Sequence, residues 1–137
     1  MRYIVLLALL ILTSYPREVI PVFKAVHPTL QPYYAEFMEL TGHVNTSEVI
    51  MVEFSTFLPK YVLGMAIGMD ADSTVLVKIS TQYWNELSDN QKWWLVMHEL
   101  SHDILNWEHG KNILMGTPMP WFVSDLMIAQ AKIDLRQ

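Results

Sequence analysis

The chain has 137 residues, of which 52% are hydrophobic and 17% charged, so it can fill one folded core and carries too little charge for a disordered segment. Its formal net charge is -5 and it has no basic cluster, so we expect no nucleic-acid partner. The absence of Cys excludes disulfides, thiolate metal ligands and a cysteine nucleophile, so any bound metal must use His, Asp or Glu.

An apolar run of eleven residues, 3–13, follows Arg2 at the N-terminus. Its length is typical of the hydrophobic region of a signal peptide and is shorter than the roughly 20 residues that span a bilayer. We therefore predict that residues 1–14 are an export signal, which makes the protein secreted or periplasmic. No A-x-A cleavage motif follows, so an uncleaved membrane anchor and a buried first helix are the alternatives.

Four prolines punctuate residues 16–32, and we expect residues 15–28 to form an extended lead-in, with Pro28 at or near the start of a helix. Apolar residues at three- and four-residue spacing predict a helix over 29–41. Gly42 follows where a left-handed residue commonly ends a helix.

Three short apolar segments, partly β-branched and separated by Pro, Gly and Asp residues, predict strands over 49–54, 62–67 and 74–79. Ser88 and Gln91 then have the spacing of a capping box, which predicts a strong helix over 91–105.

Asn106 tolerates the left-handed conformation that ends helices, so the chain is expected to turn there. After a Gly- and Pro-containing stretch over 110–120, residues 121–135 have apolar periodicity and no helix breaker, which predicts a closing helix. We expect one α+β domain over residues 29–137.

The residues His98-Glu99-Leu100-Ser101-His102 form an HExxH sequence inside the predicted 91–105 helix. The two His are four residues apart, so they point from one face of the helix and can bind one Zn²⁺ together. Glu99 can reach a water on the zinc without entering the coordination shell. The motif predicts His98 and His102 as metal ligands and Glu99 as a general base.

A zinc held by this motif requires a third protein ligand. His109 is the nearest candidate, because a sharp turn at Asn106 would bring it back below the metal. The alternatives are Glu108 and Asp125, in which case His109 is an exposed loop residue. The two remaining His, His27 and His43, have no ligand partner nearby in sequence and are expected to face solvent.

The run from His98 to His109 resembles the metzincins, zinc metallopeptidases with the pattern H-E-x-x-H-x-x-G-x-x-H followed by a Met-turn. It has one more residue before its turn, where Asn106 replaces the Gly. This spacing is similar to that of small bacterial and phage matrixin-like proteins, which have H-E-x-G-H-x-x-x-G-x-x-H and then Ser-Ile-Met. Ser101 replaces the Gly within that pattern, and Ile113-Leu114-Met115 follow at the corresponding place.

The resemblance covers roughly residues 29–136 and implies a small metzincin-like zincin domain, with a short mixed sheet, an N-terminal helix, the HExxH helix and a C-terminal helix. It implies one Zn²⁺ per chain, bound by His98, His102 and His109. Met115 would be the Met-turn residue beneath the ligands, although it can equally be a core residue.

The resemblance further implies a metallopeptidase that hydrolyses peptide bonds by a zinc-activated water, with Glu99 as the general base. The substrate would be a peptide or protein or, in a narrower alternative, a cell-wall peptide. The resemblance suggests that Leu63 to Ile67 form an edge strand that holds an extended peptide by strand addition, and the alternative is that this segment is sheet core. We expect a monomer that touches a membrane only through an uncleaved 1–14 segment. The alternative is a catalytically inactive zinc-binding or interaction protein on the same fold.

Other residues of the 91–105 helix are given structural roles. Trp93, Trp94, Met97 and Leu100 are expected on its buried side. Asp103 is expected on its solvated face, with the orientation of a ligand imidazole as the alternative.

Overall fold

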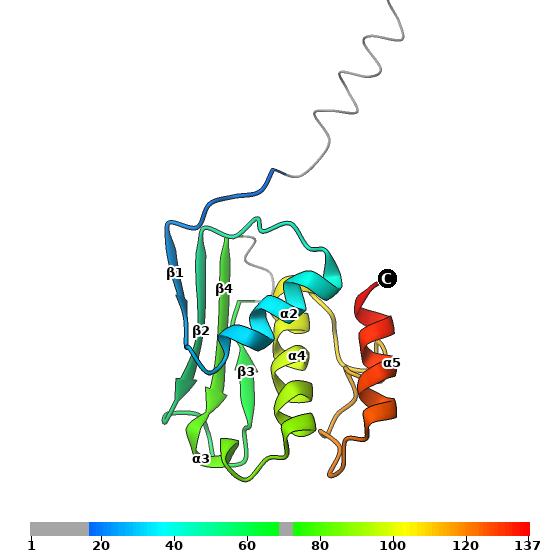
Figure 1. Cartoon of the computed structure of the whole chain (residues 1–137). Helices are drawn as coiled ribbons and strands as arrows, with labels where there is room; N and C mark the ends of the chain where they lie inside the picture. The colour runs from blue at the N-terminus through cyan, green and yellow to red at the C-terminus, as the bar shows by residue number, and fades with distance from the viewer. Residues whose placement is uncertain (1–16, 69–72) are drawn as a thin grey trace, which may run out of the picture.

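The computed structural model describes residues 17–68 and 73–137. In these ranges one mixed sheet lies against helices, so the expected α+β class is confirmed (Figure 1). The export signal or membrane anchor predicted over residues 1–14 lies outside the described residues. None of the helices in the described ranges combines the length and the apolar character that crossing a bilayer requires.

The sheet in the described ranges has four strands, β1 (Phe23–Val26), β2 (Val49–Ser55), β3 (Gly64–Ala66) and β4 (Thr74–Ser80). Their order is β1-β2-β4-β3, with β1, β2 and β4 parallel and β3 antiparallel to β4. The three predicted strands are present. The strand expected over 62–67 pairs over three residues only, and it lies at an edge of the sheet.

Strand β1 was not predicted, because its residues fall within the expected lead-in. It pairs in parallel with β2, from Phe23 opposite Val49 to Val26 opposite Val52. Three of its four residues are exposed, so its sequence carries no alternation of buried and exposed positions. Part of the extended lead-in is therefore an edge strand of the sheet.

Helix α2 (Gln31–Thr41) begins two residues after the predicted position, and Pro32 rather than Pro28 lies in its first turn. It ends at Gly42, whose φ of 59° is the left-handed conformation predicted there. Helix α3 (Thr81–Trp84), a single turn, was not predicted. Helix α5 (Asp125–Leu135) begins later than the predicted residue 121, because the side chain of Ser124 accepts a hydrogen bond from the backbone N–H of Met127 and caps the helix there.

Helix α4 (Asp89–Leu105) runs beside the sheet, next to β3 (Figure 1). Its capping box is confirmed, since Ser88 and Gln91 exchange both hydrogen bonds. Burial of each large apolar side chain contributes about 1.5–3 kcal/mol, which fixes the helix against the core. The side chains expected on its buried side are all buried, and they join apolar residues of α2 and the sheet in one core: Trp93, Trp94, Met97, Leu100, Phe37, Ile50, Val52, Val77 and Ile79.

Candidate metal centre

Three imidazole rings meet at the C-terminal half of α4. The Nε2 atom of His102 lies 3.1 Å from Nε2 of His98 and 3.0 Å from Nε2 of His109, and the latter two atoms are 3.2 Å apart. The structure therefore brings together the three His that the sequence analysis proposed as ligands.

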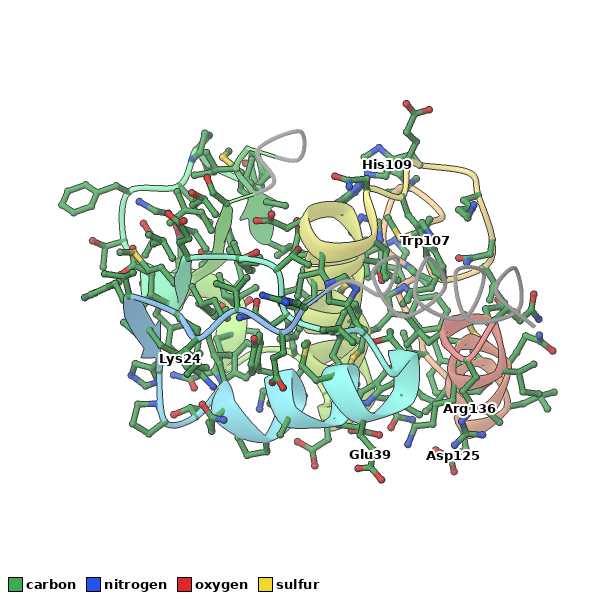
Figure 2. All side chains as sticks on the ribbon, turned by 90° about the horizontal axis from the view of Figure 1, so that it is seen from above. Lys24, Glu39, Trp107, His109, Asp125 and Arg136 are labelled. Atoms are coloured by element: carbon green, nitrogen blue, oxygen red, sulfur yellow. The ribbon has the colours of Figure 1, made fainter. Side chains whose placement is uncertain are left out.

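The turn after α4 positions the third ring. Asn106 has φ of 52° and ψ of 37°, the left-handed conformation expected for it, and its backbone N–H donates to the carbonyl of Ser101. Trp107 donates to the same carbonyl. This reversal returns His109 over the end of α4, where Figure 2 shows it.

Backbone carbonyls fix the tautomers of the two helix rings. Nδ1 of His98 lies 2.8 Å from the carbonyl oxygen of Leu114, and Nδ1 of His102 lies 2.6 Å from that of Trp107. A carbonyl only accepts, so each Nδ1 carries the proton and each Nε2 presents a lone pair. Sequence reasoning missed both carbonyls, because no side-chain pattern identifies a backbone acceptor.

Three Nε2 atoms at these distances can share one cation. Two nitrogens bound to one tetrahedral Zn²⁺ at the usual bond length lie about 3.3 Å apart, close to the observed separations. Burial lowers the pKa of His98 and His102, which favours the neutral rings that bind metal. The three rings thus fit a zinc ion in donor type, protonation and spacing.

Glu99 is buried beside this cluster, with 7% of its surface exposed. Burial raises its pKa to about 7, and a hydrogen bond from the backbone N–H of Ala66 opposes the rise. A divalent cation on the three His would also favour the carboxylate.

Gly64 of β3 makes room for the Glu99 side chain. A Cβ at Gly64 would lie 2.8 Å from Cγ and 2.9 Å from Oε1 of Glu99, closer than such atoms approach. A larger residue at position 64 would therefore force the Glu99 side chain to shift, so glycine permits this close approach of the strand, and its backbone angles play no part. The sequence analysis did not single out Gly64, since only the packing of β3 on α4 reveals its role.

Two cavities meet at this point. One of about 870 Å³ extends from His98 and Glu99 to Trp121, and one of about 410 Å³ lies between β3 and His109. Gly64, Glu99 and His109 line both. A ligand at the three His would therefore have space on either side.

Asp103 is buried, so the prediction that its carboxylate faces solvent is wrong. It is 6% exposed, and its Oδ2 accepts a hydrogen bond of 2.7 Å from the backbone N–H of Leu76 in β4. Its Oδ1 has no hydrogen-bond partner among the described residues. Burial raises its pKa to about 6. The carboxylate thus ties the turn of α4 that holds His102 to the sheet.

The alternative third ligands have other surroundings. Asp125 begins α5, far from His109 in Figure 2, and its Oδ1 accepts from Asn90 at the opposite end of α4. Glu108 is exposed and lines the smaller cavity.

Met115 is fully buried, and its neighbour Leu114 supplies the carbonyl that holds His98. The Met-turn role of Met115 stays a prediction, because a core residue would be buried in the same way.

Of the remaining two His, His27 is exposed, as expected. His43 is half-buried, so the expectation that it faces solvent is wrong.

No family model, curated protein or solved structure matches the chain.

Proposed function

We propose that this protein is a zinc-dependent, metzincin-like metallopeptidase. The observation that carries the proposal is the convergence of His98, His102 and His109 through Nε2, with buried Glu99 beside them. The carbonyl bonds at Nδ1 hold the two helix rings in the tautomer that binds metal. The same residues carry the sequence resemblance, from the HExxH run to the turn that contains Met115.

The three imidazoles would hold the ion, and the His109 ring lines both cavities. Zinc in such a site lowers the pKa of water toward about 7 and polarises the carbonyl of the scissile bond. Glu99 lies where both cavities meet, so its carboxylate can take a proton from the attacking water and pass it to the leaving amine. Water thereby adds across the C–N bond of the substrate, and the products are a carboxylic acid and an amine.

Strand β3 would hold the substrate. Among residues 17–68 and 73–137 it pairs with β4 alone, and Gly64, Met65 and Ala66 line the smaller cavity along with Glu99. An extended peptide can add to such an edge through backbone hydrogen bonds. A peptide backbone placed there would run beside both Glu99 and the His cluster.

The test measures zinc content and peptide hydrolysis in the same preparations. The wild-type protein is expected to hold one zinc per chain and to cleave a peptide mixture, with loss of activity to a chelator and recovery on adding zinc. Glu99→Gln should keep its zinc and lose about 10²–10⁴-fold in turnover.

The matched control is Glu39→Gln, since Glu39 is an exposed residue of α2 on the side of the molecule away from His109 (Figure 2). Undiminished turnover by zinc-loaded Glu99→Gln protein contradicts the mechanism. Zinc binding without hydrolysis of any peptide, cell-wall peptides included, would instead favour the catalytically inactive interaction protein.

A further inference from the structure

Helix α5 carries apolar residues on both of its faces. Ala131 and Leu135 are buried on its inner face, and Lys132 forms an ion pair of 2.7 Å with Glu36 of α2. A helix that is apolar on both sides is typical of one buried between two partners. The eleven residues of α5 are too few to cross a bilayer, so the outer face predicts a protein partner.

The outer face of α5 carries an exposed apolar stripe, which consists of Leu126, Ala129 and Ile133. Leu126 is 80% exposed, Ile133 is 51% exposed, and Ala129 is exposed between them. Their i, i+3, i+7 spacing places them along one side of the helix, and none of them belongs to the core of the described residues. Phe122, which is 76% exposed, lies just before the helix begins.

The pattern of the stripe is complementary to itself. Its large residues, Leu126 and Ile133, lie at the two ends, and the small Ala129 lies between them. If two copies of α5 pack antiparallel with a twofold axis near Ala129, Leu126 of each copy faces Ile133 of the other. A small residue at the axis lets the two helices approach closely.

The charges on one flank of the stripe match in the same arrangement. Asp125 and Arg136 are exposed and lie eleven residues apart, about three helical turns, so they share a flank. Figure 2 shows both on the same side of α5. An antiparallel twofold pair brings like flanks together in opposite directions, so Asp125 of each copy lies opposite Arg136 of the other. Within residues 17–68 and 73–137, Arg136 forms no ion pair of its own.

We propose that α5 is a homodimer interface, in which the stripes of two copies pack antiparallel and Asp125 of each copy pairs with Arg136 of the other. This arrangement differs from the monomer expected from the sequence, and it does not depend on the proposed function. With Phe122 included, the contact would bury about 1,000 Å² in total, near the lower limit of a specific interface. We therefore expect a reversible dimer with a Kd of about 1–100 μM.

Sedimentation velocity of the full-length protein, over concentrations that span this Kd, measures the association. Ala129→Glu brings two carboxylates together at the twofold axis and should weaken the dimer at least about tenfold. The matched control is Ala25→Glu, at an exposed alanine of β1, which should leave the dimer unchanged. Circular dichroism verifies that each variant is folded.

A charge exchange tests the pairing of Asp125 with Arg136. Arg136→Glu alone should weaken the dimer, because it faces a carboxylate of the second copy. Asp125→Lys combined with Arg136→Glu should restore the dimer, since the pair then has the opposite polarity. Losses that simply add in the double variant would overturn the proposed pairing.

Disulfide crosslinking tests the direction of the helices. The chain contains no Cys, so a single introduced Cys reports what lies beside it. Ala129→Cys should crosslink with itself near the axis. Ile133→Cys should not, because its two copies would lie about 10 Å apart along the helices, beyond the reach of a disulfide. A mixture of the Leu126→Cys and Ile133→Cys proteins should crosslink as a heterodimer.

Three results would overturn the inference. The first is a monomer at every concentration, and the second is a dimer that Ala129→Glu and Arg136→Glu leave intact, which would place the association elsewhere in the chain. The third is binding of the stripe to phosphatidylcholine vesicles without self-association, which would favour a lipid surface. None of these measurements depends on zinc or on hydrolysis, so the inference and the proposed function fail separately.

Discussion

The Nδ1 atom of His102 lies 2.6 Å from the carbonyl oxygen of Trp107, in the turn that follows its own helix. One contact thus joins the His102 ring, a proposed metal ligand, to the backbone reversal that returns His109 to the cluster. Because the carbonyl fixes the proton on Nδ1, the same contact prepares Nε2 to bind a cation. The turn therefore determines where the His109 ring lies and which nitrogen of His102 carries the proton.

The first prediction concerns the third ligand. His109→Ala should weaken zinc binding by more than about a hundredfold, since loss of a direct ligand costs at least as much as the 10–100-fold known for outer partners. Competition with a chromophoric chelator measures the affinity. His27→Ala, at an exposed His outside the cluster, is the control. Unchanged affinity, with a loss in Asp125→Ala or Glu108→Ala instead, would reassign the ligand.

The second prediction concerns metal and stability. The three His converge only in the folded chain, so zinc should bind the folded state and, at about a thousand times its Kd, stabilise the protein by about 4 kcal/mol. Thermal unfolding with zinc, with chelator and after zinc is restored measures the effect. Mg²⁺ should have none, because it prefers oxygen ligands. A Tm that does not respond to saturating zinc would argue against the site.

The third prediction concerns Gly64. Gly64→Ala places a methyl group 2.8 Å from Cγ of Glu99, so the side chain proposed as the general base must move, and we expect the three His to stay in place. Turnover should fall at least about tenfold with zinc content unchanged, and stability should fall by about 1–3 kcal/mol. Kinetics and urea denaturation measure the two effects.

A double variant shows whether Gly64 acts through Glu99. Adding Gly64→Ala to Glu99→Gln should lower turnover little further, because the affected group is already disabled. Fully additive losses would mean that Gly64 acts elsewhere.

The fourth prediction concerns Asp103. Asp103→Ala leaves the Leu76 N–H without its acceptor and should cost about 1–3 kcal/mol of unfolding free energy. Asp103→Asn keeps an oxygen acceptor without burying a charge and should recover most of the loss. Chemical denaturation compares the variants. Equal losses of unfolding free energy in both variants would mean that the charge of Asp103, and not its hydrogen bond, contributes the stability.

Local features of the chain could be predicted from the sequence because they depend on residues a few positions apart. The i, i+4 spacing of His98 and His102 puts two rings on one helix face, and the Ser88 capping box starts that helix. Asn106 ends it in the left-handed conformation for the same local reason. The α+β class followed from short β-branched segments beside strong helical periodicity.

Tertiary structure decided what depends on residues far apart in the chain. It placed His109, rather than Asp125, beside the two helix rings, and it set Gly64 against Glu99. It also buried Asp103 against the sheet, where a helix-face pattern predicted solvent.

These relationships arise when a strand edge, a helix and a loop pack together, and strand β1 joined the sheet in the same way, through pairing rather than through its own pattern. Sequence periodicity encodes which face of an element is apolar. The partner that covers that face, and the backbone groups it presents, are fixed only by the packing of the whole domain.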